Sequence, residues 1–294
     1  MLDKTILDQL NRCAEALESR LDSDVISYHG PLHHSLIKDF RNFIEEIAEG
    51  DNKKPRLSIF IKTLGGVVEP VEKMVEIIRQ HYEEVYFFVP DSAMSAGTIF
   101  CMSGDRIYMD YTSSLGPIDP QVLVNNDGNG RYVPALGYLE QVDRLILKSK
   151  DGTLTPAEFA LLQGQDLALL SSYEQARDLS IELLKAWLVK YKFRSWTHHR
   201  SDPNKKGTIV TDEEKECRAV EIAKLLGNHQ FWHSHGRMIG AEKLRSIVKL
   251  EIDDYTNDRD LKLLVRAYND ILTDYIDRQR YVCYFHNRRK TSTQ

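Results

Sequence analysis

The stretch Val85-Tyr-Phe-Phe-Val-Pro-Asp-Ser-Ala-Met-Ser-Ala-Gly-Thr98 carries the strongest indication of the fold. Its first five residues are almost continuously apolar, which is typical of a parallel strand buried on both faces of a sheet. A turn of small residues and then a helical segment follow, so Ser95 is placed at a strand-to-helix junction. The run from Ala93 to Gly97 differs from the hydrolase elbow Gly-x-Ser-x-Gly by one methyl group at its first position. Ser95 is therefore a candidate nucleophile, and the alternative is a serine that only caps the following helix.

A pair of glycines follows the preceding predicted strand, in Thr63-Leu-Gly-Gly-Val67. Glycine lets backbone N–H groups approach a ligand oxygen closely, because it has no Cβ atom. The N–H groups of Gly65 and Gly66, together with the N–H of Ala96, are candidates for an oxyanion hole. The alternative is an ordinary tight turn.

Apolar strands and amphipathic helices alternate around these two motifs. The spacing of apolar residues predicts strands over 24–29, 56–63, 85–89 and 106–109, and helices over 2–21, 36–47 and 68–82. This alternation predicts an α/β fold with a parallel sheet covered on both faces. A turn cluster at 125–130 predicts a hairpin, and Thr155-Pro-Ala-Glu158 predicts the start of a helix.

The length of 294 residues suits one large domain or two modest ones. We expect an N-terminal amphipathic helix over 1–21, an α/β domain over 22–192 and a helical C-terminal extension over 193–294. Within the extension, Arg200–Gly207 has the composition of a linker. The four cysteines are far apart in the sequence, which is typical of free thiols in a reducing compartment, so we expect a cytoplasmic protein.

Charge and hydropathy argue against two classes of partner. Lys and Arg number 39 and Asp and Glu number 44, giving a net charge of −5, which is unlike a general nucleic-acid binder. The longest apolar run, residues 85–90, is far shorter than the ~20 residues of a transmembrane helix. We therefore expect no nucleic-acid partner and no membrane span.

Two longer motifs resemble a known family. Met94-Ser-Ala-Gly-Thr98 followed by Ser114-Leu-Gly-Pro-Ile-Asp-Pro-Gln121 is similar to the serine dehydrogenase proteinase family, a relative of signal peptide peptidase A and of the Clp protease proteolytic subunit. The similarity extends over 28–30, 59–69 and 82–121, and more loosely over 232–237; it departs at Leu64, where the family usually has proline. The resemblance implies a Clp/crotonase-like fold of repeated β-β-α units. It also implies a homo-oligomeric serine peptidase that cleaves peptides or unfolded proteins and needs no cofactor.

A serine hydroxyl needs a base to become a good nucleophile. The Clp subunit has a histidine downstream of its serine, but Asp119-Pro120 occupies that place here. The resemblance to signal peptide peptidase A points to a lysine instead, and we favour Lys150 over Lys148. A histidine from the cluster at His229, His233 and His235 is the second choice.

The predicted site is thus a Ser95–Lys150 pair with Gly65, Gly66 and Ala96 as oxyanion donors. The histidine cluster lacks the spacing of a metal site, so no metal is expected. In a competing interpretation the protein has the same fold but no peptidase activity. It would then be an acyl-thioester enzyme or a catalytically silent oligomeric scaffold. The glycine loop would serve a thioester enzyme equally well, because both chemistries stabilise a developing negative oxygen.

Overall fold

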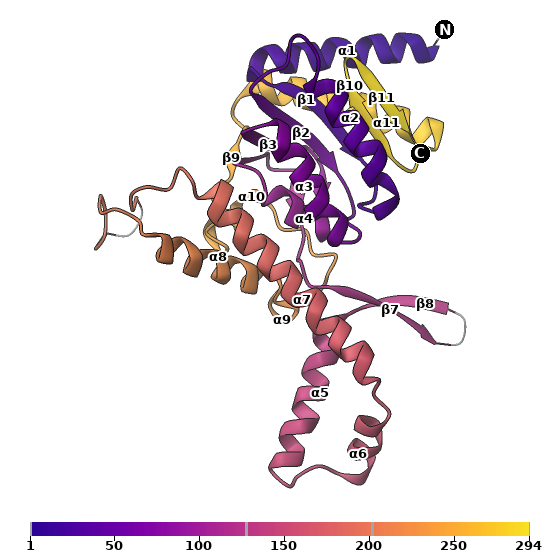
Figure 1. Ribbon diagram of the computed structural model, residues 1–294, viewed down its shortest axis with the longest axis vertical. Coiled ribbons are helices and arrows are strands. Elements are labelled where there is room, and N and C mark those ends of the chain that lie inside the picture. Colours follow the sequence, from indigo (N-terminus) through magenta and orange to yellow (C-terminus); the bar gives the residue numbers. More distant parts are fainter. Residues whose placement is uncertain (1, 127–128, 201–202, 294) are drawn as a thin grey trace.

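The computed structural model describes residues 2–126, 129–200 and 203–293, and its centre is a seven-stranded sheet in the order β11-β10-β1-β2-β3-β5-β9 (Figure 1). The strands are β1 (Asp24–His29), β2 (Arg56–Lys62), β3 (Glu84–Val89), β5 (Arg106–Met109), β9 (Asp253–Asp254), β10 (Tyr284–Asn287) and β11 (Lys290–Thr293). The strands from β1 to β9 are parallel, whereas β10 and β11 run antiparallel to their neighbours. The predicted α/β fold is confirmed, with strand bounds within one residue of those expected for β1, β2, β3 and β5.

Helices cover both faces of this sheet. The α-helices of the described residues are α1 (Leu2–Leu21), α2 (Ile37–Ala48), α3 (Glu69–His81), α4 (Ala96–Cys101), α5 (Ala135–Lys150), α6 (Pro156–Gln163), α7 (Leu167–Trp187), α8 (Asp212–Leu226), α9 (His229–Trp232), α10 (Ala241–Ser246) and α11 (Arg259–Gln279). Alternate residues of β2 point to opposite faces: Ile59 and Ile61 lie in a core with α2, α3 and α4, whereas Phe60 lies in a core with α1 and α11. Burial on both faces explains why these strands read as continuous apolar runs.

The C-terminal part of the chain completes the sheet. Strand β10 pairs with β1, and the side chain of Asn287 donates a 2.8 Å hydrogen bond to the backbone oxygen of Val25. Helix α11 packs against α1 from the other end of the sequence. The extension therefore contains strands as well as helices. The proposed domain boundaries stay a prediction, and residues 201–202 of the expected linker lie outside the described residues.

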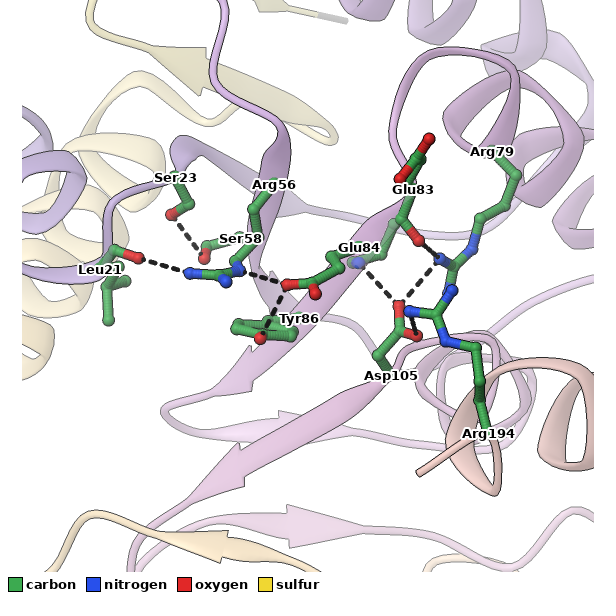
Figure 2. A network of polar contacts seen from close by, with 11 residues as sticks. Leu21, Ser23, Arg56, Ser58, Arg79, Glu83, Glu84, Tyr86, Asp105 and Arg194 are labelled. Atoms are coloured by element: carbon green, nitrogen blue, oxygen red, sulfur yellow. Dashed lines mark hydrogen bonds and ion pairs between the residues drawn. The ribbon is translucent and has the colours of Figure 1, made fainter. Parts of the chain in front are cut away.

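A charge network around the largely buried Asp105 ties the sheet to the chain that follows α7. Asp105, just before β5, accepts hydrogen bonds of 2.9 Å from Arg79 and 2.8 Å from Arg194, and the N–H of Val85 also donates to it (Figure 2). The guanidinium of Arg79 lies 3.7 Å from the ring centre of Tyr191. Burial lowers the pKa of Arg79, so this cation relies on its acceptors for stabilisation. The network anchors the segment after α7 to the end of the sheet where β2, β3 and β5 begin.

Two segments project from the sheet-bearing body. Figure 1 shows the hairpin of β7 (Gln121–Asn126) and β8 (Asn129–Pro134) on one side, and α5 with α6 directed away from the sheet. The predicted hairpin is confirmed, although residues 127–128 of its turn lie outside the described part. The predicted helix start at Thr155 is also confirmed, because the side chains of Thr155 and Glu158 form a capping box. Among the helices that the structure describes, none combines the length and apolar character needed to cross a membrane.

Candidate active site

Ser95 lies in a tight turn beside the sheet. Strand β3 ends at Val89, the short strand β4 (Ser92–Ala93) follows, and α4 begins at Ala96. Ser95 has φ 52° and ψ −118°, a backbone conformation that L-residues rarely adopt. Its side chain is half-buried and makes no capping hydrogen bond to the helix. The alternative interpretation, in which Ser95 serves as a helix cap, therefore has no support from the geometry.

The glycine loop presses directly against this turn. A Cβ atom on Gly65 would lie 2.7 Å from the backbone oxygen of Met94 and 2.9 Å from Cβ of Ser95. Gly65 and Gly66 have φ values of 102° and 150°. The N–H of Leu32 donates to the oxygen of Gly65 at 3.0 Å, which pins the loop to the segment after β1. Both glycines are thus required by close approach as well as by backbone conformation.

The three predicted oxyanion donors differ in whether their N–H groups already have an acceptor within the described part of the chain. The N–H of Gly65 donates to Oγ1 of Thr63 at 2.9 Å, so the chain itself already provides its acceptor. Among the residues that the structure describes, the N–H groups of Gly66 and Ala96 have no hydrogen-bond acceptor. Gly66 and Ala96 are therefore the donors left for a ligand, and Gly65 contributes the close contact with Ser95.

The second motif of the resemblance lies beside Ser95. Strand β6 (Ser114–Leu115) pairs in parallel with β4, and a Cβ atom on Gly116 would lie 3.2 Å from the backbone nitrogen of Ser95. The hydroxyl oxygen of Thr98 accepts a 2.9 Å hydrogen bond from the N–H of Gly116. Segments that are about twenty residues apart in sequence are thus joined at the nucleophile turn.

A histidine and an aspartate meet next to this segment. Nδ1 of His235 donates a 2.9 Å hydrogen bond to Oδ1 of Asp119, whose side chain is fully buried, whereas the side chain of His235 is 24% exposed. Ile239 forms an antiparallel bridge with Leu115, which brings this part of the extension to β6. The sequence offered His235 as a second choice of base, but it did not reveal Asp119 as its partner. The sequence did contain one indication of this role: Asp119 stands where the Clp subunit has its histidine.

The two lysines lie on the projecting helices. Lys148 forms an ion pair with Glu158, which lowers the pKa of that carboxyl to about 2. Lys150 is the last residue of α5 and is exposed, at the end of a helix that Figure 1 shows directed away from the sheet. A helix of 16 residues is about 24 Å long, so α5 does not bring Lys150 beside Ser95 of the same chain. The Ser-Lys pair stays a prediction.

The rest of the histidine cluster has separate partners. Nε2 of His229 lies 3.4 Å from a carboxylate oxygen of Glu140 on α5, and His233 ends α9 with a φ of 63°. Within the described part of the chain, no group of three His, Cys, Asp or Glu side chains is arranged to hold a metal ion.

A cavity of about 240 Å³ adjoins Asp119. Its wall includes both neighbours of the aspartate, Ile118 and Pro120, together with Arg177 of α7 and Lys224 of α8. The cavity is large enough for one amino-acid side chain.

Parts of this chain are similar to known proteins. Residues 25–158 match the family described as ClpP-like SDH-type serine proteinases. Two uncharacterized proteins of Methanocaldococcus jannaschii, MJ0137 and MJ1495, are 32% identical over 125 residues and 29% identical over 146 residues. These matches cover 42% and 48% of this chain, and 41% and 46% of the relatives. The chain thus spans less than half the length of the curated relatives it matches.

Two solved structures are also similar, both alanine mutants of the membrane-bound stomatin-specific protease 1510-N. The first is 15% identical with a TM-score of 0.46 over 81% of each chain. The second, in complex with a substrate peptide, is 26% identical with a TM-score of 0.32, over 43% of this chain and 59% of that one. The family match covers the Ser95 turn, the glycine loop and Asp119. Residues 25–158 of this chain are therefore similar to the ClpP-like SDH-type serine proteinase family.

Proposed function

We propose that this chain is a serine peptidase that hydrolyses peptide bonds with Ser95 as its nucleophile. The observation that carries the proposal is the strained turn of Ser95 packed against the Gly65-Gly66 loop. A non-glycine residue in such a conformation costs about 1–3 kcal/mol, and such strain is concentrated at functional sites. The match of residues 25–158 to a serine proteinase family supports the same activity.

The surrounding groups suit acyl transfer. Oγ of Ser95 would attack the carbonyl carbon of a peptide, and the carbonyl oxygen would become negatively charged. The N–H groups of Gly66 and Ala96, which have no acceptor among the described residues, would donate to that oxygen. Water would then release the acyl group from Ser95, restoring the hydroxyl.

The substrate we propose is a peptide or an unfolded protein. The cavity beside Asp119 offers a place for one substrate side chain, with Arg177 and Lys224 as cations on its wall. A cytoplasmic location stays a prediction.

We also propose a homo-oligomer. In the projecting α5–α6 segment the large apolar side chains of Leu147, Phe159 and Leu161 are exposed. A second copy of the chain could bury them. The Ser95–Lys150 hypothesis depends on this assembly, because only the α5 of another copy would bring Lys150 to Ser95. Mixing the Ser95→Ala and Lys150→Ala variants tests that version: hybrid sites would recover activity if the lysine comes from a second copy. Light scattering on the purified chain measures the assembly itself.

A fluorophosphonate probe tests the nucleophile. We expect it to label Ser95, and we expect Ser95→Ala to abolish both labelling and hydrolysis of an unfolded protein substrate. Ser92→Ala is the matched control: Ser92 lies in β4, three residues before Ser95, and its loss should leave both signals intact. A folded protein that resists the probe and cleaves nothing would instead favour the acyl-thioester enzyme or the silent scaffold.

A further inference from the structure

The hydrogen bond between His235 and Asp119 has the geometry of a base and its orienting acid. Asp119 is fully buried and, as a carboxylate, accepts from Nδ1–H of His235 at 2.9 Å. This tautomer leaves Nε2 unprotonated and able to accept a proton. Within the described residues, Nε2 of His235 has no hydrogen-bond partner, and the ring is partly open to solvent. The imidazole is therefore both oriented and available.

The chain path places this pair in the neighbourhood of Ser95. Strands β4 and β6 run side by side, with Ala93 opposite Leu115, and Gly116 still touches the backbone nitrogen of Ser95. Asp119 is three residues beyond Gly116, and three residues span at most about 11 Å. The bridge between Ile239 and Leu115 holds the His235 segment along the same strand.

Five other candidate bases have acidic partners or lie elsewhere in the described part of the fold. Lys148 is held by Glu158, and Lys150 ends a helix directed away from the sheet. His229 faces Glu140 on α5. His29 and Lys62 lie at the ends of β1 and β2. Lys62 pairs with Asp91 at 2.6 Å, and the buried His29 lines a pocket together with residues of α11.

We propose that His235 is the catalytic base of Ser95 and that Asp119 is the residue that positions it; this rests on the peptidase function proposed above. As the bond from Oγ of Ser95 to the substrate carbonyl carbon forms, the hydroxyl proton passes to Nε2 of His235. The same proton then passes to the leaving amine as the peptide C–N bond breaks. Water attacks the acyl group in the second half, giving its proton to Nε2, and the proton returns to Oγ as the serine is released.

The decisive experiment combines His235→Ala with added imidazole. Proton transfer by a positioned side chain contributes about 10²–10⁴ in rate, so hydrolysis by His235→Ala should fall by that factor at an unchanged Tm. Imidazole should restore part of the rate, because it fills the space and replaces the lost group. The control is His233→Asn, which alters a neighbouring histidine at a positive φ and should keep full activity without response to imidazole.

Asp119→Asn tests the positioning role. It should lower kcat and leave KM unchanged, because the amide no longer favours the tautomer that accepts a proton at Nε2. If His235→Ala does not fold, His235→Gln takes its place, since the glutamine amide can still donate to Asp119.

The outcomes separate this inference from the proposed function. Failure of the wild type to cleave, or of the probe to label Ser95, would overturn the peptidase proposal and the base with it. Wild-type turnover in a folded His235 variant, or a loss that imidazole does not reverse, would overturn only the base. Recovery of activity on mixing Ser95→Ala with Lys150→Ala would assign the base to Lys150 and contradict His235.

Discussion

A Cβ atom on Gly65 would lie 2.9 Å from Cβ of Ser95, so the glycine loop and the nucleophile turn are in direct contact. Real Cβ atoms essentially never approach that closely, and the second neighbour, the backbone oxygen of Met94, cannot rotate aside. The position of Ser95 thus depends on a residue in a different β-α unit. Rates of hydrolysis should respond to the bulk at position 65.

Gly65→Ala should reduce turnover by at least about 10², because the methyl group pushes the loop and its donors away from Ser95. The matched control is Gly152→Ala. Gly152 also has a positive φ, 67°, but a Cβ atom there would meet nothing within 4 Å. Both variants should lose about 1–2 kcal/mol of stability from backbone strain. The Gly65 variant should lose more, because its methyl group also meets Met94 and Ser95, and only this variant should lose kcat. Equal turnover in the two variants would mean that the loop is only a turn.

Ser95→Gly should abolish hydrolysis and raise the free energy of unfolding by about 1 kcal/mol, since glycine adopts φ 52° and ψ −118° without the Cβ penalty. Ser95→Ala should abolish hydrolysis with stability almost unchanged, because alanine keeps the Cβ atom. Urea unfolding of the three proteins measures the difference. A glycine variant that is less stable than the alanine variant would contradict the assignment of strain to this turn.

Arg79→Met should destabilise the protein by about 3 kcal/mol, because it removes a guanidinium that is 9% exposed and deprives the buried carboxylate of Asp105 of its main partner. Arg194→Met is the control on the same carboxylate. Arg194 is 53% exposed, and its ion pair should be worth at most about 1 kcal/mol. Similar urea midpoints for the two variants would show that the network does not depend on burial.

Stability should fall as the pH decreases below about 6.5. Burial lowers the pKa of His29 to about 3 and the pKa of His286 to about 4, from an ordinary value of 6.5. Between pH 6.5 and those values the unfolded chain binds protons that the folded chain excludes, so unfolding is favoured as the pH decreases. At pH 5 each histidine should cost about 2 kcal/mol relative to pH 7.

His29→Leu isolates this effect. It should remove about 2 kcal/mol of the stability difference between pH 7 and pH 5, measured by urea unfolding at both values. His34→Gln, at an exposed histidine, should leave the difference unchanged. An identical pH response in wild type and His29→Leu would mean that His29 is protonated in the folded state.

Local sequence determined the elements and the nucleophile turn. The apolar run at Val85–Val89 is buried on both faces, and Glu84–Val89 forms β3 as predicted. The tight turn at Ser95 was also predictable, because a strand and a helix that are joined by a few small residues require such a turn between them. The glycine pair was predictable for the same reason, since a positive φ favours glycine at each position in isolation. These features depend on residues that are neighbours in the chain.

Tertiary structure alone decided which distant groups meet. Asp119 and His235 are 116 residues apart, and only the bridge between Leu115 and Ile239 brings them together. The N–H of Gly65 donates to Oγ1 of Thr63, so the N–H groups of Gly66 and Ala96 are the ones that could donate to a ligand. The direction of α5 decided that Lys150 lies away from Ser95 of its own chain. A local pattern is set by backbone preferences over a few residues, whereas a contact across the fold is set by the packing of whole helices and strands, to which every buried side chain contributes.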